Sequence, residues 1–250
     1  CRQCLNFNPF AKKFYQRELD ALIRDVDLFF AKVDRVMIFH LSGGEPFLYP
    51  KTAEIIRYIS QTYGQRIDAF RMPTNGTIVP SEELLQTLAE SRIEVTVDDY
   101  RETAPKYADQ FKLLLKRFDE YGVRYVVNKA EAWVDLAPER TDYSDHCEAW
   151  LERHFDRCCQ TWHELRGGKL YCCNYAAYAV VAGIAGEEDL EETFDLAAGH
   201  GDFKKELVEF RLGYTTKGYT NFCRKCRGFT PENADAVTPA AQIGRGIDLT

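Results

Sequence analysis

The sequence predicts an α/β protein: a partial (β/α) barrel followed by a small cysteine-rich domain. Up to residue 128, short apolar runs typical of buried strands alternate with segments whose apolar residues recur at helical spacing. The repeat of roughly 25–30 residues leaves room for a helix after each strand, which implies parallel strands joined by right-handed crossovers. The cysteines supply the second observation, because the chain has none between Cys4 and Cys147. We therefore expect a barrel domain over 1–140 and a second domain over 141–250.

The first half yields four strand–helix units in order. Apolar periodicity predicts helices over 14–33, 52–62, 81–90 and 106–121, and strands over 36–40, 67–72, 93–97 and 124–128. Ser81, followed by two glutamates, is typical of a helix N-cap. Polar residues follow each strand, and the carboxyl ends of parallel strands meet at one edge, where such folds build their sites.

The alternation of predicted strands and helices stops after Ala130, and no further strand–helix repeat is visible. We predict a short strand or loop at 133–136, a helix over 145–155 and a hairpin with arms 161–165 and 169–173 that turns at Gly167 and Gly168. Residues 180–202 are small and acidic and are read as a loop with short helical turns. An amphipathic helix over 203–212 precedes Cys223, and a tail with little to pack starts at Pro231.

Composition limits the classes of function. With 45% hydrophobic and 28% charged residues, the chain of 250 residues is typical of a soluble globular protein. The net charge of −7 argues against broad nucleic-acid binding, and no apolar run approaches the roughly 18 residues of a membrane span. Eight of the nine cysteines form four closely spaced pairs, and Cys147 stands alone; the pairs favour metal ligation in a reducing, cytoplasmic compartment over a disulfide framework.

The segment His40-Leu41-Ser42-Gly43-Gly44-Glu45-Pro46 is the most informative stretch of the first half. Two glycines after a buried strand let a ligand approach main-chain N–H and C=O groups, and the proline stiffens the exit. A tight turn would explain the glycines alone. The pair Cys1 and Cys4, one strand and one helix upstream, makes a cofactor site the better interpretation.

Gly-Gly-Glu-Pro after a strand, with cysteines upstream, resembles the radical S-adenosylmethionine (SAM) enzymes. In that family Cys-x3-Cys-x2-Cys holds a [4Fe–4S] cluster, and the Gly-Gly-Glu-Pro segment binds the amino group of SAM. The resemblance implies that Cys1 and Cys4 are cluster ligands and that Gly43, Gly44, Glu45 and Pro46 bind SAM. By their place at strand ends, Asn75 and Asp98 are further candidates for SAM contact, with structural turn and loop roles as the alternative. The first motif cysteine would lie four residues before Cys1, and the first barrel strand before that, so we expect the native chain to start earlier.

A second group of cysteines marks the C-terminal half. Cys223 and Cys226 place two thiolates on one turn, and the hairpin turn at Gly168 can carry Cys173 toward Cys158 or Cys159. Four thiolates suit zinc or an iron–sulfur cluster equally. The order resembles the SPASM and Twitch modules that follow radical SAM barrels, in the shorter version with one auxiliary [4Fe–4S] cluster. That resemblance implies Cys159, Cys173, Cys223 and Cys226 as ligands; Cys158 and Cys172 would be spare thiols.

Together the resemblances imply an oxidoreductase or epimerase that generates a 5′-deoxyadenosyl radical and abstracts a hydrogen atom from a sugar, an aminocyclitol or another small substrate. A one-electron donor such as flavodoxin or ferredoxin is implied as a partner. Two alternatives stay open: a radical SAM enzyme that modifies a peptide during natural-product maturation, and a non-catalytic zinc-binding α/β scaffold.

Overall fold

The computed structural model describes residues 1–13, 16–159, 162–186, 193–212 and 218–243. Its first half is a four-stranded parallel sheet in the order β1-β2-β3-β4. The strands are β1 (Val36–His40), β2 (Ile67–Thr74), β3 (Glu94–Asp98) and β4 (Tyr125–Asn128). They are connected through α2 (Thr52–Tyr63), α3 (Glu82–Glu90) and α4 (Ala108–Tyr121), and α1 (Leu19–Phe30) precedes them. This confirms the α/β class and the parallel sheet, whereas closure toward a barrel stays a prediction.

The two faces of the parallel sheet carry different kinds of side chain. Met72, Val95 and Val97 point to the helices and form one core with residues of α3 and α4. Phe39 packs with Phe30 of α1, and together with Phe70 it extends this layer toward β1. Since alternate residues of a strand face opposite ways, the other face carries more polar side chains.

The register of the strands determines which polar residues lie side by side on that face. His40 lies opposite Arg71, Arg71 opposite Glu94, and Asp98 opposite Asn128. The Arg71 guanidinium is 2.9 Å from the Glu94 carboxylate. The face away from the helices therefore carries a row of polar groups running toward the strand ends.

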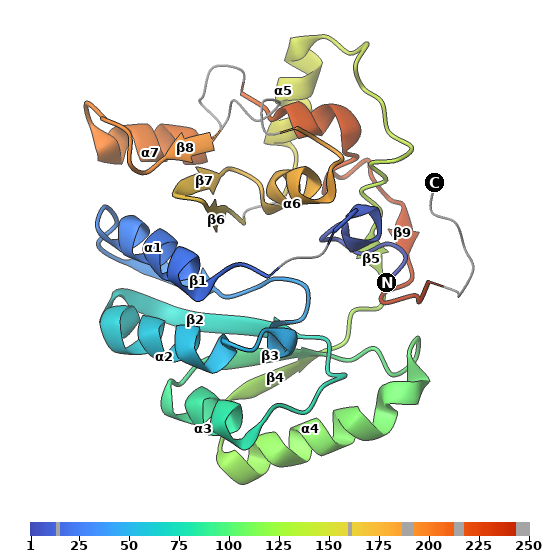
Figure 1. Ribbon diagram of the computed structural model, residues 1–250. Coiled ribbons are helices and arrows are strands. Elements are labelled where there is room, and N and C mark those ends of the chain that lie inside the picture. Colours follow the sequence, from blue (N-terminus) through green and yellow to red (C-terminus); the bar gives the residue numbers. More distant parts are fainter. Residues whose placement is uncertain (14–15, 160–161, 187–192, 213–217, 244–250) are drawn as a thin grey trace.

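The second half packs against α1. It contains the antiparallel sheet β6 (Glu164–Arg166), β7 (Lys169–Tyr171) and β8 (Thr193–Asp195), with the helices α5 (Glu148–Asp156), α6 (Asn174–Ala182) and α7 (Phe203–Arg211). Leu28 and Phe29 of α1 join the core formed by Leu170, Phe194 and residues of α7. Figure 1 shows this half stacked above α1 and β1.

Both ends of the described chain meet beside the second half. A two-stranded antiparallel sheet joins β5 (Trp133–Val134) to β9 (Ala236–Val237), and the Arg2 N–H donates to the Ala241 carbonyl at 2.7 Å. The 3₁₀ turns η1 (Asn8–Phe10) and η6 (Asn221–Lys225) lie near α6. In Figure 1 the N-terminal segment lies between α6 and β5.

Several predicted elements differ from the structure. Within 180–202, read as loop, α6 continues to Ala182 and β8 forms at Thr193–Asp195; residues 187–192 of that span lie outside the described part. The first helix begins at Leu19, and its predicted start, Phe14, lies outside the described residues, as does Thr161 of the hairpin. Over the described residues, no helix has the length and apolar character needed to cross a bilayer.

Candidate cofactor site and cysteine cluster

Glu45 connects the loop that contains Gly43 and Gly44 (the Gly-Gly loop) to the ends of the strands by hydrogen bonds. One carboxylate oxygen accepts from the Phe47 N–H at 3.1 Å and the Thr74 hydroxyl at 2.9 Å; the other accepts from the Asn75 N–H at 2.8 Å. Burial is the main cause of a raised pKa for this carboxyl, and the three hydrogen bonds lower it only in part. The side chain thus connects the loop after β1 to the turn after β2.

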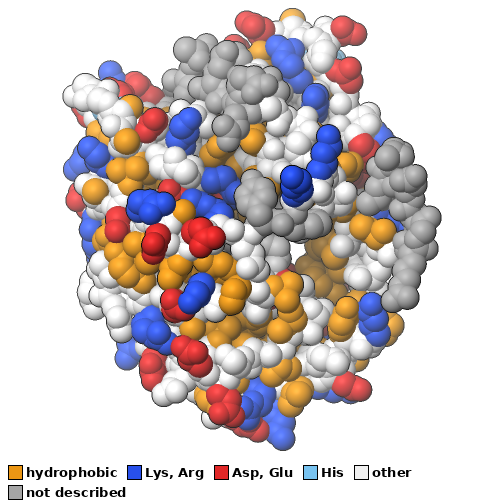
Figure 2. Space-filling model, in the orientation of Figure 1, with side chains coloured by type: hydrophobic (Ala, Val, Ile, Leu, Met, Phe, Trp, Pro, Cys, Tyr) orange, Lys and Arg blue, Asp and Glu red, His pale blue; other side chains and the backbone are white. Residues whose placement is uncertain are grey.

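The two glycines leave open space beside the loop. A Cβ placed on Gly43 would meet nothing within 4 Å, and one on Gly44 would meet only the Asn8 side-chain nitrogen, at 3.6 Å. Protein packing therefore does not require glycine here. Figure 2 shows a hollow between this region and the N-terminal residues, with hydrophobic side chains at its bottom. An open surface beside the main chain of Gly43 and Gly44, here called the Gly-Gly shelf, would let a ligand approach and accounts for both observations.

The segment after the first cysteines docks directly on this shelf. The Asn6 side-chain amide donates to the Gly43 carbonyl at 2.6 Å. Cys4 lies close enough to Tyr100 to contribute to the raised pKa of its phenol, after burial and Asp98. The fold therefore brings Cys4 beside the Gly-Gly loop, although they are distant in sequence. Cys1 is exposed.

Asn75 shapes the turn after β2. Its side-chain oxygen accepts from the Thr77 N–H at 3.0 Å and from the Thr77 hydroxyl at 2.6 Å, and Gly76 follows with φ +68°. This confirms the structural turn role that the sequence analysis gave as an alternative for Asn75. The Asn75 side chain is engaged in the turn itself, and its backbone N–H binds Glu45.

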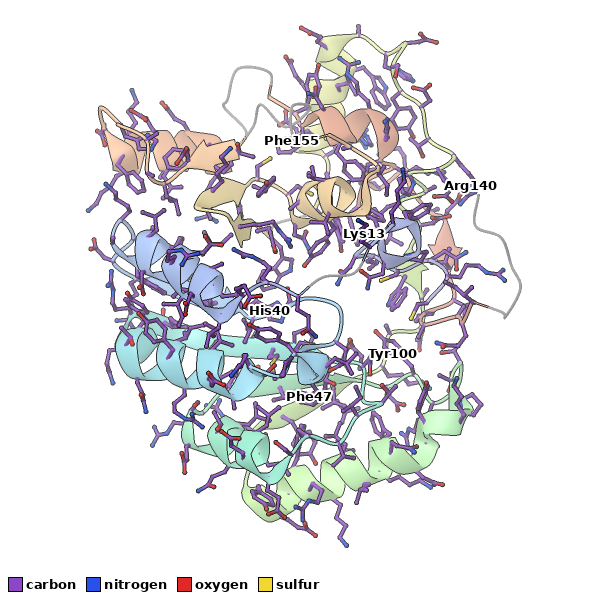
Figure 3. All side chains as sticks on the ribbon, in the orientation of Figure 1. Lys13, His40, Phe47, Tyr100, Arg140 and Phe155 are labelled. Carbon is purple, nitrogen blue, oxygen red and sulfur yellow. The ribbon has the colours of Figure 1, made fainter. Side chains whose placement is uncertain are left out.

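The two neighbouring aspartates have separate roles. Asp98 accepts from the Asn128 amide at 2.7 Å and is hydrogen-bonded to Tyr100, and burial raises its pKa. Asp99 instead pairs with Arg101, whose guanidinium lowers the pKa of Asp99. Only Asp98 therefore belongs to the polar face, and its contact with SAM stays a prediction. Figure 3 shows Tyr100 near the ends of the strands, together with His40 and Phe47.

Cys158, Cys173, Cys223 and Cys226 gather in the second half. Burial, with smaller contributions from Cys223 and Cys158, raises the pKa of Cys173 to about 12 and that of Cys226 well above its ordinary value. The sulfur of Cys226 accepts from the Gly228 N–H at 3.3 Å, and that of Cys158 from the Phe229 N–H at 3.4 Å. N–H donors aimed at the sulfurs of buried Cys226 and half-buried Cys158 fit thiolate ligation, since metal binding deprotonates a thiol that burial keeps neutral.

Cys159, which the sequence analysis favoured as the first ligand, is exposed. Its sulfur lies 4.0 Å from the Arg157 carbonyl, whereas Cys158 is the neighbour that affects Cys173 and Cys226. Across the described residues, no three His, Cys, Asp or Glu side chains are already close enough to enclose a metal ion. Ligation would therefore require the four thiols to draw closer.

Two contacts from the second half to the first were missed by sequence reasoning. The Tyr178 hydroxyl of α6 is 3.3 Å from the Ser42 hydroxyl, next to Gly43. Trp162 packs against His40, with ring centroids 5.0 Å apart. No local pattern marks either residue. Tyr100 was within reach of sequence reasoning, since it directly follows two aspartates at a strand end.

The comparison with protein families concerns the first half of the chain. A family model described as the Radical SAM superfamily matches residues 1–137. A search of curated proteins finds no match to the chain.

Proposed function

Because the chain belongs to the Radical SAM superfamily, we propose that it is an enzyme that abstracts a hydrogen atom from a small polar substrate held over the polar face of its sheet. Membership implies an enzyme with a [4Fe–4S] cluster and SAM. The observation that supports the assignment of residues is the Asn6–Gly43 hydrogen bond, which places the Cys4 segment on the Gly-Gly shelf.

The residues present fit part of the cofactor site, with two of the three cysteines of the family's motif. Cys1 and Cys4 would hold iron, and the main chain of Gly43 and Gly44 would receive the amino-acid part of SAM, with Glu45 and Pro46 fixing the loop. When bound, the cluster and SAM supply the electron and the hydrogen-abstracting radical. Asn75 and Asp98 lie at the ends of the neighbouring strands and are further candidate contacts for SAM.

The side chains on the polar face support the proposed substrate class. His40, Arg71, Glu94 and Asn128 offer both donors and acceptors. A polyhydroxylated substrate, such as a sugar or aminocyclitol, would use them, in a dehydrogenation or an epimerisation. Trp162 and Tyr178 would cover the site from the second half and exclude water.

We assign the second half a single auxiliary [4Fe–4S] cluster of the SPASM/Twitch kind, held by Cys158, Cys173, Cys223 and Cys226. The choice of Cys158 in place of Cys159 rests on burial and on the N–H···S bond from Phe229. Such a cluster would accept the electron released when a substrate radical is oxidised, with flavodoxin or ferredoxin as the external carrier.

The test of activity uses the gene product, purified anaerobically. Formation of 5′-deoxyadenosine with a panel of sugars, aminocyclitols and peptides is measured after reduction. We expect turnover with a polyol; turnover only with a peptide would replace this substrate class by peptide modification. No SAM cleavage under any condition would contradict the enzymatic assignment.

The test of the auxiliary cluster compares C158A with C159A. We expect C158A to lose the iron and sulfide of one cluster and C159A to keep both clusters. The reverse pattern would restore Cys159 as the ligand. Zinc bound in stoichiometric amount to the wild-type protein, without iron, would instead support the zinc scaffold.

A further inference from the structure

The loop between β8 and α7 carries a histidine, His200, that the proposed reaction does not use. This loop lies beside the core in which Phe194 of β8 and Phe203 of α7 pack with Leu28 and Phe29 of α1. In Figure 1 β8 and α7 lie above α1, on the opposite side of the molecule from β5 and β9. The conformation of the loop therefore bears on how the second half docks on α1.

Both ring nitrogens of His200 face hydrogen-bond acceptors. Nδ1 lies 2.6 Å from a carboxylate oxygen of Glu206, and Nε2 lies 2.8 Å from the carbonyl oxygen of Asp195. A carbonyl oxygen and an ionised carboxylate can only accept, and a neutral imidazole carries a single N–H. Only the imidazolium form of His200 therefore makes both hydrogen bonds.

Aromatic rings fix the orientation of the imidazole. His200 stacks on Phe194 with ring centroids 4.4 Å apart and an interplanar angle of 10°. The ring of Phe203 stands nearly perpendicular to the imidazole, with centroids 5.2 Å apart. Because a cation over the face of an aromatic ring is attracted by the ring quadrupole, the stack on Phe194 also favours the charged form of His200.

Glu206 connects His200 to the start of α7. Its other carboxylate oxygen accepts from the Gly201 N–H at 2.9 Å and from the Asp202 N–H at 3.2 Å. The Asp202 side chain in turn caps α7 by accepting from the Lys205 N–H at 3.1 Å. An acid of the first turn that reaches back to the N-cap N–H resembles a capping box. The contact between His200 and Glu206 thus ties the loop to the first turn of α7.

The charges around His200 favour its proton on balance. Its pKa is raised by the hydrogen bonds to Glu206 and to the Asp195 carbonyl, whereas burial and Lys32, just beyond α1, lower it. Lys169 of β7 lies opposite Asp195 in the register, on the sheet face away from Phe194. The other described charges beside the loop have partners of their own: Asp195 with the Ala197 N–H, Asp202 with the Lys205 N–H, Lys204 with Asp34, and Lys205 with Glu209.

From this geometry we propose that His200 is a pH-sensitive latch, whose imidazolium fastens the loop between β8 and α7 and whose neutral form loosens it. Neutral His200 keeps one N–H, so either the bond to Glu206 or the bond to the Asp195 carbonyl is lost, and a nitrogen lone pair then faces an oxygen. Because the folded form binds this proton more tightly than the unfolded form, the stabilisation is fully present below the ordinary pKa of 6.5 and is lost as pH rises through the raised pKa. The latch does not depend on SAM or on the cysteine groups.

Hydrogen–deuterium exchange of the full chain, followed by mass spectrometry, tests the latch at about pH 5.5 and about pH 8.5, on either side of the ordinary histidine pKa. Variant and wild type are compared at the same pH, so that the intrinsic exchange rate cancels. E206Q keeps the stack on Phe194 and removes the charge that faces His200. We expect amides 196–206 of E206Q to exchange roughly three- to tenfold faster than those of wild type at the lower pH, because a partly exposed ion pair contributes modestly. At the higher pH the two proteins should differ little.

The matched control is E209Q, which lies on the same helix and whose carboxylate pairs with Lys205. E209Q should exchange like wild type at both pH values. A proton NMR titration of the ring C–H signals, with His200 assigned through H200Q, provides a second measurement: we expect the pKa of His200 to lie above 6.5 in wild type and to fall in E206Q. A pKa at or below 6.5, or the same ratio of exchange rates between E206Q and wild type at both pH values, would overturn the proposal.

Discussion

Glu45 shows how one buried carboxylate can prepare a cofactor site. Its oxygens accept three hydrogen bonds from the ends of neighbouring segments, yet burial still raises its pKa. In the protein without SAM, the hydrogen bonds of ionised Glu45 hold the loop in place. Burial of its charge nevertheless lowers the free energy of unfolding. A bound ligand with an ammonium group would relieve that cost, which suits a site for the amino group of SAM.

A pH series on the protein without SAM measures this effect. The raised pKa means that the folded state binds the Glu45 proton more tightly than the unfolded state, so its contribution is present below the ordinary value of 4.5 and is lost as pH rises through the raised value. We expect the free energy of unfolding of wild type to fall relative to E45Q as pH rises through this window. Urea unfolding from pH 4 to pH 8 provides the measurement.

Glu54, exposed on α2 and paired with Lys51, provides the control. E54Q should follow wild type across the same pH range. Parallel curves for wild type and E45Q would show that the carboxyl of Glu45 is not held in a destabilising environment.

At the scale of elements, the turn after β2 depends on a glycine for two reasons. Gly76 has φ +68°, and a Cβ there would lie 2.6 Å from a ring carbon of Phe111. We expect G76A to lower the free energy of unfolding by about 2–4 kcal/mol, through left-handed strain and overpacking. Urea unfolding measures the change. G64A is the matched control, because Gly64 has φ −54° and open space around it, and it should change stability little.

The hairpin between β6 and β7 is fastened to α1 through one side chain. Asp25, 7% exposed, accepts from the Gly167 and Gly168 N–H groups, each at 2.8 Å, and pairs with Arg17 at 2.6 Å. D25A leaves two turn N–H groups and a guanidinium without their acceptor, so we expect a loss of about 3 kcal/mol or more in thermal or urea unfolding. D20A, on the exposed face of α1, should have little effect, and equal stability of both variants would contradict this role.

The elements with a clear period were predictable, and those without one were not. Ser81 caps α3 by accepting from the Leu84 N–H, as its sequence context predicted. The helix α6 was missed because it is apolar around most of its circumference and is buried on several sides, so it has no helical period to detect. The strand β8 exists through pairing with β7, and pairing partners are not visible in a local window.

The same limit applies to the candidate site. Gly43, Gly44 and Glu45 could be found because glycines after a strand have a local physical meaning. Contacts such as Tyr178 with Ser42 join residues far apart in the chain, and sequence patterns carry no information about them. The choice between Cys158 and Cys159 also depended on the direction of adjacent side chains, which only the fold determines.

At the scale of the whole molecule, the N-terminal cysteine segment belongs to the core of the second half. Phe7, three residues after Cys4, is 3% exposed and packs edge-on against Phe222, which precedes Cys223, with ring centroids 5.6 Å apart. Tyr175, two residues after Cys173, lies 6.4 Å from Phe7. One aromatic cluster therefore supports the two cysteine groups together, and it links the proposed domains 1–140 and 141–250.

Replacing Phe7 tests that link. F7A removes a buried ring and leaves a cavity, so we expect a loss of about 3–5 kcal/mol in the free energy of unfolding, whereas F7L, which keeps most of the volume, should lose less. Because the ring packs against the segment before Cys223, the thiols of the second half should also react faster with a thiol reagent in metal-free F7A than in F7L. Unchanged thiol reactivity in a destabilised F7A would show that the N-terminal segment does not support the second cysteine group. Faster reaction of those thiols, far from Phe7 in the sequence, would show that the two cysteine groups share one folding core.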